Sequence, residues 1–215
     1  MKKPRLLDLF CGAGGAAVGY ARAGFDVVGV DHVRQPRYPF AFVKADALQY
    51  VAEHGRDFDV IHASPPCQRY SRMRRLPWLR EKEYWDSIPP TREALKATGR
   101  AFVIENVEGA PLNTPVMLCG VSFGLHVYRH RFFESPLFLM APPHEAHPEI
   151  VSPPGRRIND RIEASPGGFV NSATKSSVAI FGRAMEIDWM TRDELSQAIP
   201  PAYTGFLGRQ IREAL

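Results

Sequence analysis

Short apolar runs, separated by stretches with helical spacing, recur along the first half of the chain. The apolar runs cover residues 4–10, 25–30, 41–45, 58–63 and 101–104. Segments with helical spacing lie between several of them, at residues 16–23, 47–54 and 91–98. Strands that alternate with helices in this way build a mostly parallel sheet. The pattern therefore predicts an α/β fold.

The second half of the chain has weaker patterns. Residues 121–125 and 131–134 read as short strands, and residues 135–177 are rich in Pro, Gly, Ser and Arg with little periodicity. We interpret the latter stretch as an irregular insertion. Thr191 and Glu194 then have the spacing of a helix capping box, and Pro200-Pro201 precedes a last predicted helix at residues 202–214.

Length and cysteine usage narrow the class of protein. A chain of 215 residues suits one core. We find neither an apolar run long enough to cross a membrane nor the apolar stretch of a signal peptide, so we expect a cytoplasmic protein without a membrane partner. The three cysteines, Cys11, Cys67 and Cys119, are odd in number and lack C-x-x-C pairing. We expect reduced thiols, no disulfide framework and no metal.

Basic and aromatic residues crowd the segment after Cys67, although the net charge of the chain is only +4. Residues 68–92 lack clean periodicity and read as a long exposed loop. A basic run is most often solvated surface, but a mixture of cations and rings suits phosphates and bases. The sequence therefore favours nucleic acid as a partner. The residues concerned are Arg69, Tyr70, Arg72, Arg74, Arg75, Trp78, Arg80, Lys82, Tyr84 and Trp85.

A glycine-rich turn at residues 11–15 follows the first predicted strand and opens the first helix. Glycines let the backbone approach a ligand, and a helix amino terminus supplies N–H donors. The spacing is not G-x-G-x-x-G, which favours an adenosyl group over a dinucleotide. Asp31 ends the second strand, where it can bind ribose hydroxyls or act as a loop acid. Asp46 ends the third, where it can meet an adenine amine or, equally well, cap the following helix.

Cys67 lies on a turn after the fourth predicted strand. Pro65 and Pro66 forbid the strand or a helix from continuing, which leaves the thiol at the carboxyl end of a strand. Open α/β sheets place their ligand sites there. Glu105 ends the fifth strand, so the two side chains should converge, although a buried core thiol is an alternative for Cys67. If the segment around Arg129 and Arg131 is extended, these two point the same way.

Taken together, these motifs resemble the DNA (cytosine-5) methyltransferase family, and the resemblance spans nearly the whole chain. It implies a Rossmann-like S-adenosylmethionine-dependent methyltransferase fold with a small irregular target-recognition insertion. Two departures are visible: Val127 stands where the eighth motif usually begins with Gln, and Ser196-Gln197 replaces a usual Gly-Asn pair. The matching motifs are residues 8–15, Pro66-Cys67-Gln68, Glu105-Asn106-Val107, Arg129-x-Arg131 and Ile199-Pro200-Pro201.

The resemblance implies a mechanism and a set of roles. Cys67 attacks C6 of a cytosine flipped out of double-stranded DNA, Glu105 shares a proton at N3, and Arg131 with Arg129 holds O2 and the neighbouring backbone. S-adenosyl-L-methionine then supplies the methyl group to C5. The implied cofactor-binding residues are Phe10, Gly12, Ala13, Gly14, Gly15, Asp31, His32, Asp46, Ala47, Pro66, Gln197 and Ala198. The implied nucleic-acid-binding residues are Gln68, Arg69, Ser71, Arg72, Arg74 and Arg75.

The same resemblance divides the chain into a catalytic domain at residues 1–134 and 183–215 and a reduced target-recognition region at residues 135–182. So short a recognition region predicts a target of about two to four base pairs, or low selectivity. A tRNA cytosine-5 methyltransferase and a catalytically silent DNA-binding protein are alternatives. The Pro-Pro-Cys-Gln motif favours DNA, and the intact catalytic residues argue against a silent protein. We expect a monomer, in a restriction-linked or a phage-protective role.

Overall fold

A seven-stranded sheet forms the centre of the computed structural model, which describes residues 2–70, 82–144, 146–147 and 178–215. The strand order is β3-β2-β1-β4-β5-β7-β6. Strands β1 to β5 are parallel to one another, whereas β7 runs antiparallel to both β5 and β6. The strands are β1 (Arg5–Leu9), β2 (Asp26–Asp31), β3 (Ala41–Lys44), β4 (Val60–Ala63), β5 (Ala101–Asn106), β6 (Val116–Leu118) and β7 (Arg131–Glu134).

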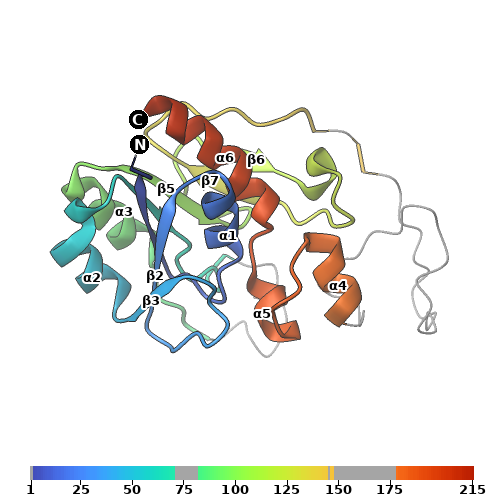
Figure 1. Ribbon diagram of the computed structural model, residues 1–215, viewed down its shortest axis with the longest axis horizontal. Coiled ribbons are helices and arrows are strands. Elements are labelled where there is room, and N and C mark those ends of the chain that lie inside the picture. Colours follow the sequence, from blue (N-terminus) through green and yellow to red (C-terminus); the bar gives the residue numbers. More distant parts are fainter. Residues whose placement is uncertain (1, 71–81, 145, 148–177) are drawn as a thin grey trace.

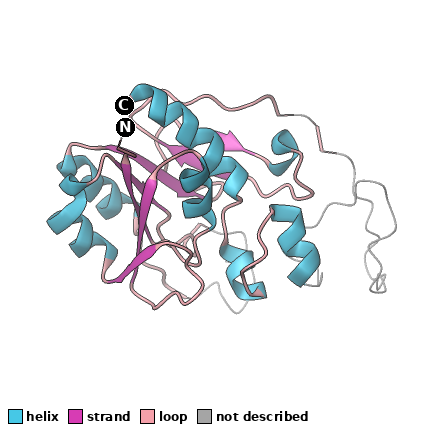
Figure 2. Ribbon diagram, viewed as in Figure 1, coloured by secondary structure: helices cyan, strands magenta, loops and turns pink. Residues whose placement is uncertain are grey.

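Helices cover both faces of this sheet (Figures 1 and 2). Successive side chains of β1 point to opposite faces. Leu6 therefore belongs to a core with Tyr20 and Tyr203, whereas Leu7 belongs to a second core with Leu95. The first face carries α1 (Gly15–Arg22) and α6 (Pro201–Ala214), and the second carries α2 (Ala47–His54) and α3 (Ile88–Thr98). The helices α4 (Val178–Met185) and α5 (Arg192–Gln197) precede α6 and lie beside the first layer.

The strand order reverses at β1, which lies between β2 and β4. At such a point the connections leave the sheet in opposite directions and open a crevice at the carboxyl ends of the strands. This topology confirms the predicted Rossmann-like α/β fold. It also places the turn after β1 and the turn after β4 side by side.

Helices α1 and α6 pack almost backbone to backbone. A Cβ on Gly19 would lie 2.0 Å from Thr204 Oγ1 and 2.2 Å from the Pro201 carbonyl oxygen, so only glycine fits. Thr204 Oγ1 donates to the Ala16 carbonyl oxygen at 2.8 Å. This contact fixes the position of α1 and of the glycine turn that precedes it.

Several predicted elements are confirmed, with shifted ends. The capping box of Thr191 and Glu194 is present. Helix α3 begins at Ile88 rather than Thr91, because Pro89 and Pro90 occupy its first turn, where a missing N–H costs nothing. All three cysteines are free thiols, as predicted. Within the described part of the chain, no helix is both long and apolar enough for a bilayer crossing.

Other predictions need correction. Residues 121–125 do not form a strand: the 3-10 helix η4 (Gly120–Phe123) stands there, closed by Gly124 with a φ of 70°. Strand β6 went unpredicted because three residues are too short to show a period. Helix α4 (Val178–Met185) directly follows the expected irregular insertion, where no helix was predicted, and its Met185 is fully buried in the main core.

Candidate active site at the carboxyl edge of the sheet

A thiol, a carboxyl and a guanidinium gather where β4 and β5 end. Cys67 follows β4, Glu105 lies near the end of β5, and β4 and β5 are parallel neighbours. Glu105 is only 6% exposed, and Arg131 on β7 reaches it with its Nε 3.0 Å from Oε1. The half-buried thiol of Cys67 interacts electrostatically with Glu105, Arg131 and Arg129. The structure thus brings together the residues that the sequence singled out.

Two polar side chains hold the turn that carries the thiol. Asn106 Nδ2 donates to the Pro65 carbonyl oxygen at 2.9 Å, and Ser87 Oγ donates to the Pro66 carbonyl oxygen at 3.4 Å. The strand β5 thereby supplies two adjacent residues with separate tasks. Glu105 faces the thiol, and Asn106 anchors the turn before it.

Burial and neighbouring charges set the protonation states here. Burial, followed by the Glu105 charge, raises the pKa of the Cys67 thiol, although Arg131 and Arg129 lower it. Burial likewise raises the pKa of Glu105 against the opposing effect of the two guanidiniums. Burial and the nearby Arg131 lower the pKa of Arg129 to about 9, which leaves it charged at neutral pH. The resting thiol is therefore protonated, and Glu105 holds a proton more readily than an exposed glutamate.

Arg129 and Arg131 bind different partners. The expected extended segment does not hold at Arg129, where φ is 32°. Its guanidinium donates from Nε to the Ala198 carbonyl oxygen at 2.6 Å and from Nη2 to the Ser196 carbonyl oxygen at 2.8 Å. Tyr203 supports this bend, because its hydroxyl donates to the Arg129 carbonyl oxygen at 2.9 Å. Arg129 therefore ties the arginine segment to residues 196–198, while Arg131 serves Glu105.

A chain of hydrogen bonds leads from the core to Glu105. Tyr20 Oη lies 3.0 Å from His62 Nδ1, His62 Nε2 lies 2.9 Å from Ser64 Oγ, and the Ser64 hydroxyl hydrogen-bonds Glu105. Burial lowers the pKa of His62 to about 3, so its ring is neutral at physiological pH. A neutral imidazole donates at one nitrogen and accepts at the other. Each hydrogen bond along this chain therefore has its donor on the same side, and the side depends on whether Glu105 is protonated.

This chain of hydrogen bonds was not predicted from the sequence. Its members come from α1, from β4 and from the turn after β4. The one available signal was the alternation of His62 and Ser64 with apolar residues, which puts both polar side chains on the same face of the strand. Tyr20 carries no such signal, because it reads as an ordinary core residue of the first helix.

The glycine turn after β1 lies against Asp31. Gly12 has a φ of 48°, and its N–H donates to Asp31 Oδ2 at 3.1 Å. Asp31 Oδ1 accepts from the Val33 N–H at 3.0 Å and lies 3.2 Å from His32 Nδ1. Apart from Gly12 and its two chain neighbours, no described residue has an atom within 4 Å of the place where a Cβ on Gly12 would stand. Open space therefore adjoins the turn at the sheet edge.

Phe10 and the segment before α6 frame the same turn. Phe10 has a φ of 56°. Residues other than glycine rarely adopt this backbone conformation, and those that do cluster at functional sites. A Cβ on Gly15 would lie 2.4 Å from the Ile199 carbonyl oxygen and 3.4 Å from the Cβ of Ala198. Trp189 Nε1 donates to the Ala13 carbonyl oxygen at 2.8 Å. Segments from both ends of the sequence thus meet around residues 10–15.

The remaining predicted cofactor residues are Asp46, Ala47, Pro66 and Gln197, and the structure gives less support for their role. Asp46 Oδ1 accepts from the Gln49 N–H at 2.9 Å, so the capping alternative for Asp46 is the one observed. Ala47 is buried in the first turn of α2. Pro66 and Gln197 are exposed. The adenine contact of Asp46 therefore stays a prediction.

Comparison with known proteins identifies the family. Residues 4–113, about half of the chain, match the family model described as C-5 cytosine-specific DNA methylase. The chain belongs to this family. It is 32% identical over 127 residues to Type II methyltransferase M.XorII of Xanthomonas oryzae pv. oryzae, which covers 51% of this chain and 29% of the relative. It is 28% identical over 115 residues to Type II methyltransferase M.FnuDI of Fusobacterium nucleatum, which covers 49% and 33% respectively.

The matched part spans only about a third of the length of these curated relatives. The methyltransferase EhMeth of Entamoeba histolytica superposes with a TM-score of 0.58 and 10% sequence identity, over 100% of this chain and 99% of that one. At that identity the likeness concerns the fold alone. It agrees with the Rossmann-like topology described above.

For a C-5 cytosine methylase, the implied cofactor is S-adenosyl-L-methionine, and the residues at the glycine turn fit it. The open space at Gly12 can accept a ligand against the backbone. Asp8 adds an orphaned group, because its buried Oδ1 has no hydrogen-bond partner among the described residues. Burial, with a contribution from Asp31, raises the pKa of Asp8 to about 8. A carboxyl that is neutral at pH 7 thus lies behind the turn.

The basic loop after Cys67 is only partly described. Gln68 and Arg69 are exposed, and Arg69 Nη1 donates to the Tyr84 carbonyl oxygen at 2.8 Å. The Tyr70 hydroxyl donates to Asp86, and Trp85 is 62% exposed. Ser71, Arg72, Arg74 and Arg75 were predicted to bind nucleic acid, and they lie outside the described residues.

Proposed function

We propose that this chain transfers a methyl group from S-adenosyl-L-methionine to C5 of cytosine in DNA, through a covalent bond between Cys67 and C6. One observation carries the proposal: the Cys67 thiol and the Glu105 carboxyl share the edge of neighbouring strands, with Arg131 3.0 Å from Glu105. The names of the curated relatives, type II methyltransferases, agree with it.

The chemistry explains why these groups are needed. C5 of cytosine is not nucleophilic until a nucleophile adds to C6, and a thiolate both adds readily and leaves again. As the bond between the Cys67 sulfur and C6 forms, N3 takes a proton from Glu105, whose pKa burial raises. Arg131 and Arg129 favour the thiolate, because they lower the pKa of Cys67. Loss of the C5 proton to water after methylation then expels the Cys67 thiolate, restores the double bond between C5 and C6, and returns the N3 proton to Glu105.

The cofactor would be held at the glycine turn, where it supplies an electrophilic methyl group. We assign the backbone of Gly12 to Gly15, with Ala13 and Gly14, to its methionine part, Phe10 to the adenine face and Asp31 with His32 to the ribose. Asp46 and Ala47 would meet the adenine edge, Pro66 would line the wall, and Gln197 and Ala198 would close the pocket. The contact between Gly15 and Ala198 supports the last assignment.

The DNA would be double-stranded, with the target base flipped into the pocket. Gln68 and Arg69 are exposed next to the thiol and are suited to touch the backbone, together with Ser71, Arg72, Arg74 and Arg75. Helix α4 begins at Val178 and packs into the main core through Phe181, Ala184 and Met185. We therefore place the target-recognition region at residues 135–177 and the catalytic domain at residues 1–134 and 178–215. The methyltransferase acts as a cytoplasmic monomer in this proposal, in a restriction-modification or phage-protective setting.

Methyl transfer from radiolabelled S-adenosyl-L-methionine tests the proposal. Wild type and Cys67→Ala are incubated with unmethylated duplex DNA and, separately, with bulk tRNA, and the products are digested to nucleosides. We expect labelled 5-methylcytosine in DNA with wild type, and at least about a thousandfold less with Cys67→Ala. Melting temperature and cofactor affinity, measured on both proteins, separate a loss of chemistry from a loss of fold.

Two results would overturn the proposal. Label in tRNA alone would assign the same chemistry to RNA. An absence of transfer to either nucleic acid, with intact cofactor binding, would make the chain a silent binding protein. Sequencing of the modified DNA would show whether the target has the expected length of about two to four base pairs.

A further inference from the structure

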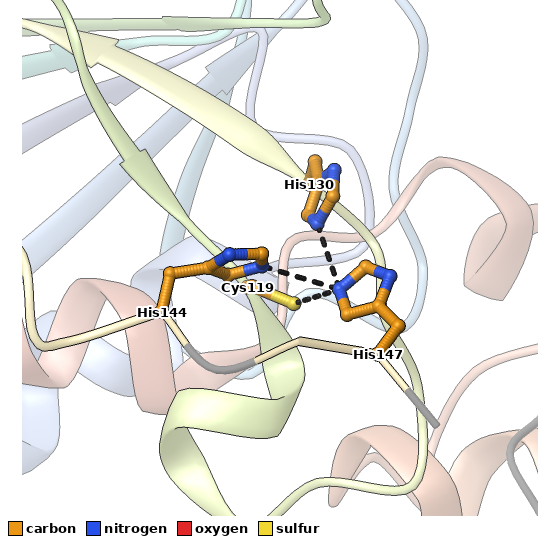
Figure 3. A group of neighbouring side chains, drawn as sticks. All are labelled: Cys119, His130, His144 and His147. Atoms are coloured by element: carbon orange, nitrogen blue, oxygen red, sulfur yellow. Dashed lines mark hydrogen bonds between the residues drawn. The ribbon is translucent and has the colours of Figure 1, made fainter. Parts of the chain in front are cut away.

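One thiol and three imidazoles converge beside the end of the β6–β7 pair (Figure 3). Cys119 follows β6, His130 precedes β7, and His144 and His147 lie in the segment after β7. Each offers one potential ligand atom, and these four atoms lie within 4.8 Å of one another. Three of the seven histidines of the chain are in this group.

Hydrogen bonding alone does not account for the arrangement. His130 Nε2, His144 Nε2 and Cys119 Sγ lie 3.1, 3.2 and 3.2 Å from the same atom, His147 Nε2. An imidazole nitrogen has either one hydrogen or one lone pair in the ring plane, so it makes one good hydrogen bond and not three. A cation at the centre would satisfy all four atoms, because each would point a lone pair at it.

The separations agree with a tetrahedral metal site. Zinc lies about 2.0–2.1 Å from imidazole nitrogens and about 2.3 Å from thiolates, which puts neighbouring ligand atoms about 3.3–3.6 Å apart. The observed contacts of 3.1 and 3.2 Å are close to that range. The remaining pairs of ligand atoms lie within 4.8 Å of one another, so side-chain rotations that bring them closer would complete the shell.

We propose that Cys119, His130, His144 and His147 bind a structural zinc ion. Imidazole and thiolate are the ligands that zinc prefers, and four protein ligands leave no open position for catalysis. Cys119 is 1% exposed, whereas His144 is exposed, so the site has a buried floor and an accessible side through which a metal can enter. The Tyr128 ring stacks on His147, with centroids 3.9 Å apart and an interplanar angle of 11°, and orients that ligand.

The position of the cluster indicates what the zinc would do. His130 lies between Arg129 and Arg131, so the metal would fix the stretch from which both arginines extend. His144 and His147 belong to the first part of the proposed recognition region. Two other contacts hold this part: Ser122 Oγ donates to the Pro143 carbonyl oxygen at 2.9 Å, and the Gln210 amide bonds the Met140 backbone. The zinc site itself does not depend on the proposed methyl transfer. Its role in fixing the arginines and the recognition region rests on that proposed function.

Metal content tests the site directly. The full chain, without a histidine tag, is loaded with Zn²⁺, desalted and analysed by mass spectrometry for metals. We expect about one zinc ion per chain in wild type and at least about tenfold weaker binding in the double variant His144→Ala/His147→Ala. The matched control is His126→Ala, because His126 is exposed in the same segment and outside the cluster. It should retain the metal.

A spectroscopic measurement guards against variants that fail to fold. Co²⁺ bound by Cys119 in wild type should show a thiolate-to-metal charge-transfer absorption and intense tetrahedral ligand-field bands. Zn²⁺ should displace both, and Cys119→Ala should lack the charge-transfer band. The proposal is overturned if wild type holds no more zinc than the double variant, or if bound Co²⁺ shows no thiolate band. Both readouts are independent of methyl transfer, so the zinc site and the proposed function fail separately.

Discussion

Cys67 and Cys119 occupy comparable places and have different neighbours. Each follows a strand of the same sheet, and burial raises the pKa of each thiol. Cys67 faces a carboxyl and two guanidiniums, whereas Cys119 faces imidazole nitrogens. Guanidiniums stabilise a thiolate, and a nearby acid can supply a proton, so such surroundings suit a thiol that attacks and leaves again. Imidazole nitrogens offer lone pairs, so they suit a thiol that binds a metal ion together with them. The surroundings, more than burial or the strand end, decide what a thiol can do.

Among the variants that test this comparison, Glu105→Gln is expected to have the largest effect, a fall in the rate of methyl transfer. It keeps the shape of the side chain but removes the proton that Glu105 shares with the base in the proposed mechanism. Positioned proton transfer contributes about a hundredfold to ten-thousandfold, so single-turnover methyl transfer should fall by that factor. Glu108→Gln, an exposed control on the following turn, should leave the rate unchanged. Equal rates for the two variants would remove Glu105 from the mechanism.

Removal of the metal should raise the alkylation rate of Cys119 and leave that of Cys67 unchanged. A zinc-bound thiolate reacts slowly with alkylating reagents, and a chelator releases it. We expect alkylation of Cys119 by N-ethylmaleimide to speed up at least about tenfold when a chelator is added, with Cys67 alkylation constant. Peptide mass spectrometry measures both cysteines in one sample. Equal acceleration at both cysteines would contradict a site confined to Cys119.

Alkylation of Cys67 should depend steeply on pH. Its pKa is raised above the ordinary value of 9.0, so the thiolate is scarce at neutral pH and increases about tenfold per pH unit until the raised pKa is reached. The rate with iodoacetamide should therefore climb throughout the neutral range. Arg131→Gln removes a charge that lowers this pKa, and it should slow the reaction at any given neutral pH. A plateau of the wild-type rate near pH 7 would contradict the raised pKa.

Ser64→Ala should have the smallest effect. The Ser64 hydroxyl lowers the pKa of Glu105 by hydrogen-bonding its carboxylate, so its loss moves that pKa further upward. Glu105 then keeps its proton to higher pH, and the alkaline limit of methyl transfer shifts to higher pH. One hydrogen bond is worth about 1 kcal/mol, which limits the rate change to about tenfold. In a Glu105→Gln background the shift should vanish, and a persistent shift would assign Ser64 a different role.

The convergence of Cys67 and Glu105 was predictable because parallel strands carry the residues after them to one edge. The conformation of Arg129 was not, since its positive φ depends on Tyr203 and on acceptors at residues 196–198, which are remote in sequence. Cysteine spacing alone predicted no metal, yet the proposed ligands lie at positions 119, 130, 144 and 147. His144 and His147 form the one short spacing among them; the rest is made by the fold.

The contact between α1 and α6 also bears on how the molecule folds. The bond from Thr204 to Ala16 joins residues 188 positions apart. Long-range contacts form slowly, because the entropy of closing a long loop must be lost before the contact stabilises anything. The glycine turn leads directly into α1 and rests against residues 198–199. We therefore expect the proposed cofactor pocket to be among the last parts to become ordered in refolding, after the sheet around β4 and β5 has formed.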